Sequence, residues 1–129
     1  MEKSFFQLLE QNIINVEFVK NENYSNEREI SLEFNYQTEI NINENNTANV
    51  ILDFSIFNKE CLKEYPFYIK VVISGIFTWD KDTNNEILQE LLQFNAPAVL
   101  LSYIRTMIST LTAFSGYPAL IIPLMNFKK

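Results

Sequence analysis

Residues 29–42 read EISLEFNYQTEINI, the most regular alternating stretch in the chain. Apolar and polar side chains alternate along it, which is the pattern of a β-strand with one buried face. Because parallel strands are buried on both faces, this one-sided pattern favours an antiparallel sheet. The stretch therefore predicts a half-buried antiparallel strand whose apolar face carries Ile30, Leu32, Phe34, Tyr36, Ile40 and Ile42.

Three further segments predict the rest of a four-stranded sheet. Residues 12–20 alternate in the same way, and residues 48–57 and 67–77 are rich in β-branched and aromatic side chains. Short polar connections indicate a meander of the last three strands, with the first strand at an edge or beside it. Residues 5–9 fit a helical turn or a loose tail equally well. The apolar face of the first strand is expected to carry Ile14, Val16 and Phe18.

The hydrophobic period changes after the fourth strand. Thr83 and Glu86 form the T-x-x-E pattern of a capping box, and Asn95 with Pro97 predicts the start of a longer helix. Gly116 is expected to end that helix, and Arg105 to lie opposite its apolar face. The chain is therefore predicted to be one α+β domain over residues 1–129, with the long helix on one face of the sheet. The helix's apolar face carries Leu100, Tyr103, Ile104, Met107, Ile108 and Leu111.

An apolar tail follows the predicted helix. Residues 119–125 are almost all apolar, and Pro118 and Pro123 prevent them from forming a regular helix. The run is too short to span a bilayer, and no segment of the chain is expected to form a transmembrane helix. We expect the tail to be extended and to lie against an apolar surface.

The composition excludes several functions. The chain has 129 residues and a net charge of −6, which disfavours nucleic acid and anionic membranes as partners. It has no histidine and one cysteine, Cys61, so we expect neither a metal site, a cofactor nor a catalytic triad. Glu33, Glu39 and Glu44 are interpreted as a solvated strand face. The single cysteine and the absence of a signal peptide predict a cytoplasmic protein.

The third and fourth strands carry apolar residues on both faces, and one helix can cover only one face. Such a surplus indicates an interface with another chain or a binding groove; alternatively, the tail and the N-terminal segment cover it within a monomer. One face is expected to hold Val50, Leu52, Phe54 and Ile56 of the third strand with Ile69, Val71 and Ile73 of the fourth. The other is expected to hold Ile51, Phe57, Tyr68, Val72 and Ile76.

Residues 96–127 resemble the signature region of the SecB family of protein-export chaperones. The family pattern there is Pro, then Tyr-x-Arg, then a helix, Gly-x-Phe/Tyr-Pro, an apolar stretch and Asn-Phe. The sequence GIF at residues 75–77 is a second match at the right distance upstream, and the strand order agrees with the family fold. The matching residues are Pro97, Tyr103, Arg105, Pro118, Leu120, Asn126 and Phe127.

The resemblance implies an ATP-independent holdase that binds unfolded polypeptides in an apolar groove and assembles as a homotetramer, a dimer of dimers. A groove of this kind needs no sequence code, so it can bind many clients. The family's groove positions match Ile30, Leu32, Phe34, Phe67, Val71, Ile76, Tyr103, Leu120 and Ile122. Its assembly positions match Ile69, Val71 and Ile73, joined by Tyr103 and Met107 on the helix. The alternative interpretation is that each of these residues belongs to the hydrophobic core of a single chain.

Departures from the family pattern affect the expected partners. Asn15, Val19 and Lys70 stand where family members that deliver clients to the SecA motor have acidic residues, so that contact is doubtful. Phe114 and Ser115 replace the Arg-Gly that precedes the family's turn, and the sequence ends before the family's next helix. A SecB-like chaperone dedicated to one partner, such as an antitoxin, is the alternative function. A small-molecule binder or enzyme is the weakest hypothesis, which a closed cavity with converging polar groups would support.

Overall fold

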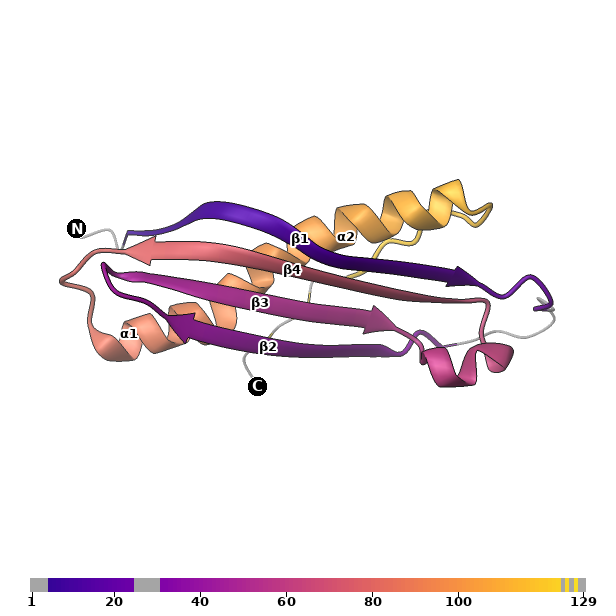
Figure 1. The fold of residues 1–129 in the computed structure, drawn as a ribbon, viewed down its shortest axis with the longest axis horizontal. Helices are drawn as coiled ribbons and strands as arrows, with labels where there is room; N and C mark the ends of the chain where they lie inside the picture. Colours follow the sequence, from indigo (N-terminus) through magenta and orange to yellow (C-terminus); the bar gives the residue numbers. More distant parts are fainter. Residues whose placement is uncertain (1–4, 25–30, 124, 126, 128–129) are drawn as a thin grey trace.

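The fold is that of an antiparallel sheet with one long helix across it, seen in a computed structural model that describes residues 5–24, 31–123, 125 and 127. Ile30 and Asn126 lie outside the described residues. The described strands form one sheet in the order β1-β4-β3-β2, so β2, β3 and β4 are the expected meander and β1 is added at an edge (Figure 1). Their bounds are β1 (Phe6–Lys20), β2 (Phe34–Ile42), β3 (Thr47–Ile56) and β4 (Phe67–Trp79).

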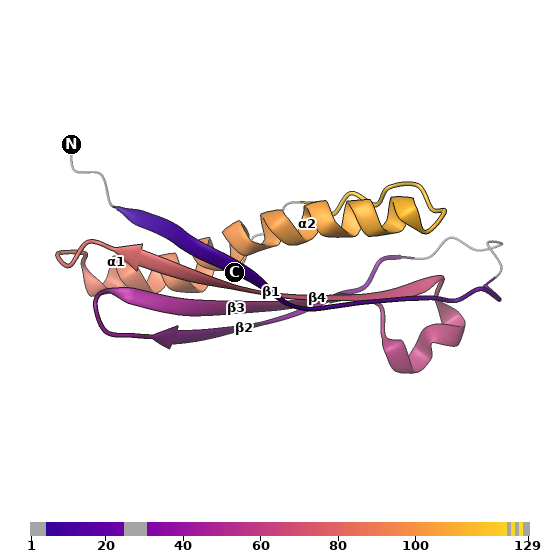
Figure 2. The ribbon, with the colours of Figure 1, turned by 45° about the horizontal axis from the view of Figure 1, so that its top comes forward.

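The two faces of the sheet carry different helical elements. A continuous helical stretch covers one face, while a short 3₁₀ helix, η1 (Lys59–Glu64), lies on the other side (Figure 2). The predicted α+β class, with the long helix on one face, is therefore confirmed. The stretch consists of α1 (Asn85–Glu90), a π-helical segment, η2 (Leu91–Asn95), and α2 (Ala96–Phe114). We call the sheet face under α2 the helix face and the other the open face.

β1 is longer and less regular than the sequence indicated. Residues 6–9, left undecided by their pattern, belong to the strand, and residues 6–8 pair with β4. The register shifts between Leu8 and Glu10 and between Ile13 and Asn15, so Leu9 and Ile14 are extra residues at β-bulges. Each bulge shifts the alternation by one residue, so the single alternating face expected for Ile14, Val16 and Phe18 is interrupted at Ile14.

The helix begins differently from the prediction. Asn84, not Thr83, is the N-cap: its Oδ1 accepts a hydrogen bond from the Glu86 N–H at 2.7 Å. The helix also does not start afresh at Asn95. Pro97 has no N–H to donate to the preceding turn, and the chain passes through η2, where the Ala96 N–H donates to the Leu91 carbonyl. The predicted stop is confirmed, since α2 ends at Phe114 and Gly116 follows with φ of 88°.

The core lies between α2 and the helix face. Gly75 permits the close contact, because a Cβ there would lie 2.9 Å from the Leu100 side chain. The helical stretch Asn85–Phe114 is long and apolar enough to cross a membrane by length and composition, contrary to expectation. Core helices have the same composition, and α2 packs on the sheet. The fully buried residues include Val50, Leu52, Phe54, Ile56, Ile69, Val71, Leu100, Ile104 and Ile108.

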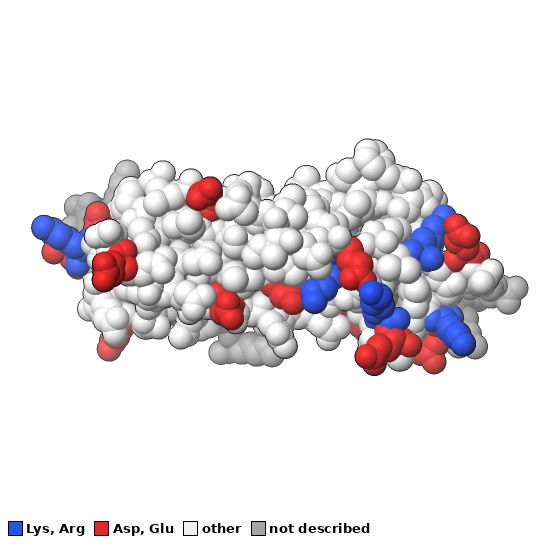
Figure 3. Space-filling model, in the orientation of Figure 1, with Lys and Arg blue, Asp and Glu red and all other residues white. Residues whose placement is uncertain are grey.

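The open face is more polar than the sequence indicated. Tyr68 and Val72 lie on it with little exposure, but Lys70 lies between them on the same strand and takes part in an ion pair. Lys70 Nζ lies 3.4 Å from Asp53 Oδ2, and on η1 Lys59 Nζ lies 2.5 Å from Glu17 Oε2. Figure 3 shows acidic and basic side chains next to one another on this face, towards the end that carries η1.

Candidate functional site

An apolar cavity opens beside the C-terminal end of α2. Its volume is about 310 Å³, and it is open to solvent. The connection between η1 and β4 forms one wall, and the chain that leaves α2 forms another. The lining residues are Leu32, Phe57, Pro66, Phe67, Thr112, Tyr117, Pro118, Ala119 and Leu120, and we call this space the aromatic cavity.

Stacked aromatic rings build the floor of the aromatic cavity. The Phe57 ring stacks on Tyr65 at 4.4 Å between centroids and meets Phe67 edge-on at 5.4 Å. Phe67 also packs against Tyr117 at 5.5 Å and Phe18 at 5.9 Å. Aromatic pairs of this kind add to the stabilisation from burial and present broad apolar surfaces.

Phe57 reaches this cluster through an unusual backbone conformation. Its φ is 66°, in the left-handed region that bulky residues avoid, and its side chain is 2% exposed. The prediction that Phe57 lies on the face of Ile51 is therefore wrong, because the chain leaves β3 at Ile56 and the alternation ends there. Strain of this kind is concentrated at functional sites.

The tail is held in place by three side chains. Tyr117 Oη donates to the Pro66 carbonyl at 2.9 Å, and the Leu120 N–H donates to Thr112 Oγ1 at 2.9 Å. Arg105 Nε donates to the Ile122 carbonyl at 2.6 Å, and the Ile122 side chain is fully buried. The tail thus turns back along α2 (Figure 2). Its residues 117–120 form a wall of the aromatic cavity.

Lys20 closes the same end of the molecule. Its Nζ donates to the Ser115 carbonyl at 2.9 Å and lies 5.2 Å from the Tyr117 ring centroid. A cation at a helix C-terminus is favourable, and so is one over an aromatic face. Burial raises the pKa of the Tyr117 phenol. Burial also raises the pKa of Tyr65, and the nearby Glu33 carboxylate adds to that effect.

Three of the predicted groove residues meet at the aromatic cavity: Leu32, Phe67 and Leu120. Phe34 lies on the helix face of β2 and packs on Phe54 at 5.7 Å between ring centroids. Ile122 belongs to the tail, and its side chain is fully buried in the core. The predicted residue Ile30 falls outside the described chain.

The other predicted groove residues lie elsewhere. Val71 is fully buried in the core. Ile76 pairs with Glu10 and Asn49 on the open face, so it cannot line the same groove as Leu32. Tyr103 is on the outward side of α2 and is 38% exposed.

The predicted assembly residues divide into two groups. Ile69, Val71 and Ile73 have at most 2% exposure, so within one chain they fit the core interpretation and offer no side-chain surface to a partner. Tyr103 is exposed, and Met107 is half-buried against the core.

Sequence reasoning expected the tail to lie against an apolar surface, but it did not name six of the lining residues as groove residues: Phe57, Pro66, Thr112, Tyr117, Pro118 and Ala119. The motif YPF at residues 65–67, followed far along the chain by GYP at 116–118, was the available signal. Glu39 and Glu44 are exposed as expected, and Glu33 is exposed and accepts a hydrogen bond from Tyr65 at 3.3 Å. Among the described residues, no three His, Cys, Asp or Glu side chains gather in a way that could hold a metal ion.

The fold and the comparisons define the class of protein. The family model described as "Preprotein translocase subunit SecB" matches residues 5–129. The chain therefore belongs to the SecB family, whose SecB-like members are chaperones and not enzymes.

Relatives of known sequence agree with this assignment. An uncharacterized protein of Methanocaldococcus jannaschii is 31% identical over 113 residues, which cover 86% of this chain and 72% of that protein. A protein-export protein SecB of Anaplasma marginale is 27% identical over 62 residues, which cover 48% of this chain and 35% of that protein.

Solved structures share the fold. The SecB-like chaperone Rv1957 of Mycobacterium tuberculosis, in complex with a ChAD peptide from the Rv1956 HigA1 antitoxin, superposes with a TM-score of 0.69 at 11% identity. That match covers 93% of this chain and 87% of the other. A protein of unknown function from Streptococcus agalactiae gives a TM-score of 0.58 at 15% identity, over 95% of this chain and 99% of the other.

Proposed function

We propose that this chain is an ATP-independent holdase that binds apolar segments of unfolded polypeptides at the aromatic cavity. The observation that carries the proposal is a solvent-open apolar cavity lined by Phe57, Phe67 and Tyr117 in a member of a chaperone family. Burial of one Leu or Phe side chain contributes about 1.5–3 kcal/mol, which suits weak and sequence-tolerant binding. No nucleotide is needed, because binding and release then follow from the folding of the client.

The backbone of a client also has a place to pair. β2 is an edge strand, hydrogen-bonded to β3 on one side only. Leu32 lines the aromatic cavity immediately before β2, and Phe34 begins the strand. An extended client segment with one side chain in the cavity can continue along β2 by β-strand addition.

We further propose assembly with copies of the same chain, in keeping with the expected dimer of dimers. β1 is the other edge strand, and its exposed apolar residues include both bulge positions. An edge of this kind is a liability in a monomer, and pairing with a second copy covers it. The exposed residues on β1 are Leu9, Ile13, Ile14 and Val16, with exposures from 38% to 60%.

A chaperone dedicated to one partner, such as an antitoxin, is the alternative function. On the open face, Lys70 is paired with Asp53, and Asn15 and Val19 add no acidic charge. This arrangement does not favour the contact with a SecA-type motor. The antitoxin peptide bound to the structurally similar M. tuberculosis chaperone supports the alternative. Either function suits a cytoplasmic protein.

Aggregation of a chemically denatured test protein, followed by light scattering without nucleotide, tests the main proposal. We expect equimolar chaperone to slow the aggregation. If several unrelated denatured proteins aggregate at their normal rate, the general holdase is ruled out. Co-purification of one antitoxin encoded beside a toxin gene would then favour the dedicated chaperone.

A further inference from the structure

The end of the described chain has the chemistry of a client. From Tyr117 onwards the sequence is mostly apolar and is interrupted by Pro118 and Pro123, the described residues 117–123 form neither helix nor strand, and an aromatic residue stands at Phe127. These are the features by which an unfolded polypeptide differs from a folded surface. Phe127 also lies on the helix face, where its ring contacts Tyr36 of β2, the strand on which a client would pair.

The two halves of the tail are held differently. The first half is fixed by hydrogen bonds from Tyr117 and Arg105 and to Thr112, and its Ile122 side chain is fully buried. It is part of the wall of the aromatic cavity. The second half is described only at Met125 and Phe127, which are half-buried and pack against the edge of the core.

Phe127 reaches the edge strand. Its ring meets the Tyr36 ring edge-on, at 4.9 Å between centroids. Tyr36 is on β2, on the same face as Phe34 and two residues along the strand. A client segment that starts in the aromatic cavity beside Leu32 and runs along β2 would reach this position next.

We propose that Met125 and Phe127 are built-in occupants of the client groove, which an unfolded polypeptide must displace from the edge of the core and from Tyr36. This inference rests on the proposed holdase function and concerns its regulation. The first half of the tail stays in place as a wall, while Met125 and Phe127 leave with the incoming client. A groove filled by its own chain end is shielded from contact with other apolar surfaces when no client is present. Because a client binds only when the groove is empty, its apparent affinity equals the intrinsic affinity multiplied by the fraction of time for which the groove is empty.

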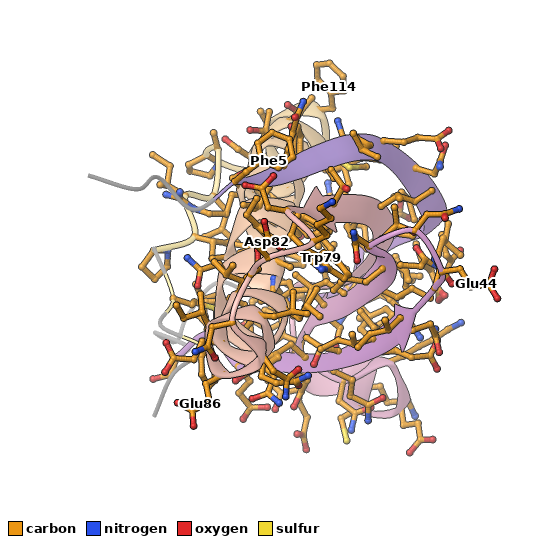
Figure 4. The ribbon with its side chains drawn as sticks, turned by 90° about the vertical axis from the view of Figure 1, so that its left-hand side faces the viewer. Phe5, Glu44, Trp79, Asp82, Glu86 and Phe114 are labelled. Carbon is orange, nitrogen blue, oxygen red and sulfur yellow. The ribbon has the colours of Figure 1, made fainter. Side chains whose placement is uncertain are left out.

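Two variants and one control test the inference. Phe127→Ser removes the ring, and a chain that stops after Pro123 removes the whole occupant. Phe114→Ser is the matched control, because Phe114 is 85% exposed at the end of α2 and its ring points away from the rest of the chain (Figure 4). Thermal unfolding by circular dichroism verifies that each variant is folded.

The probe is reduced, carboxymethylated α-lactalbumin labelled with a fluorophore, whose binding is followed by fluorescence anisotropy. We expect Phe127→Ser and the shortened chain to bind it about five- to tenfold more tightly than the wild type, with Phe114→Ser unchanged. Affinity that is unchanged or reduced in both variants overturns the inference, because Phe127 is then part of the groove wall or irrelevant to it. That result leaves the holdase function standing.

A second measurement separates the two proposals. A labelled peptide of residues 123–129 is added to the shortened chain and to the wild type. We expect saturable binding to the shortened chain and at least fivefold weaker binding to the wild type. If the peptide binds neither chain, self-occupancy is contradicted. If the peptide binds but no protein binds the unfolded probe, self-occupancy stands and the holdase function fails.

Discussion

Arg105 Nε donates a hydrogen bond to the carbonyl of Ile122 at 2.6 Å, so the one charged side chain between Leu91 and Phe114 holds the tail. Arg105 was expected to lie opposite the apolar helix face, but its hydrogen bond to the tail was not predicted. The helix and a segment 17 residues further along the chain are joined here by a single charged donor.

Arg105→Ala is expected to lower the free energy of unfolding by about 1.5–3 kcal/mol, because a partly buried carbonyl loses a charged hydrogen-bond donor. Urea denaturation measures the loss. Cleavage of the tail by chymotrypsin should also become faster. Lys81→Ala, at an exposed loop cation, is the control and should leave both measurements unchanged. Equal stability of the two variants would mean that the Arg105 hydrogen bond does not hold the tail.

Thr112→Val keeps the shape of a fully buried side chain but removes the acceptor for the Leu120 N–H. We expect a loss of about 1–3 kcal/mol, since that amide is left unsatisfied. Thr106→Val is a matched control, because Thr106 is exposed and its hydroxyl bonds only within the helix. If both variants unfold at the same urea concentration, the tail does not depend on Thr112.

Leu32→Asp tests the aromatic cavity. Leu32 is 38% exposed and lines the cavity just before β2, so a charge there should cost little stability and weaken binding of an unfolded polypeptide about tenfold or more. Fluorescence anisotropy with the labelled, carboxymethylated α-lactalbumin measures this affinity. Ile87→Asp on α1, at a similarly exposed apolar residue, should not change the affinity. Unchanged binding in Leu32→Asp would exclude the cavity as the site.

Assembly through β1 is tested by Ile14→Arg, at a bulge residue that is 54% exposed. Charge repulsion at a symmetric edge should halve the mass measured by light scattering, while Ile42→Arg on β2 should keep it. Ile73→Arg is not suitable for this purpose. Ile73 is 2% exposed beneath α2, so an arginine there is expected to unfold the chain by burying an unpaired charge. A mass unaffected by Ile14→Arg would exclude β1 as an interface.

Alkaline pH should weaken the fold through its buried phenols. Burial raises the pKa of Tyr117 above the usual value of about 10, so above that pH the unfolded chain releases a proton that the folded chain keeps. The stabilisation is complete below pH about 10 and is lost as the pH rises through the folded-state pKa. Urea midpoints at pH 9, 10 and 11 should fall, and Tyr117→Phe should make the fall shallower. An identical fall in that variant would contradict the assignment.

Local patterns were sufficient where one periodicity holds over a whole element. The meander of β2, β3 and β4 was predicted because β2 alternates between apolar and polar side chains, β3 and β4 are rich in β-branched and aromatic residues, and the connections are short and polar. The pattern was misleading at Phe57, where a left-handed residue breaks the alternation, and it did not reveal the bulge in β1 at Ile14. Neither leaves a sequence signal, since a bulge depends on the register with the neighbouring strand.

The candidate site was only partly predictable for a similar reason. Leu32, Phe67 and Leu120 were named from the family resemblance, and they do meet. Phe57 and Tyr117 join them, although these two residues are about 60 positions apart in the chain. They meet because the chain before η1 and the chain after α2 come together in space. Ile76 was assigned to the groove but belongs to the opposite face.

By itself, the sequence determined the class of fold, the meander of the last three strands and the end of the helix at Gly116, and its motifs indicated the SecB family. The first three follow from local preferences: alternation, helical spacing, and the backbone freedom of one glycine. Only the tertiary structure decided that the tail folds back on α2, that Arg105 and Thr112 hold it, and that aromatic rings from three segments line one cavity. Such contacts join residues far apart in the chain, and their geometry depends on the packing of the whole domain.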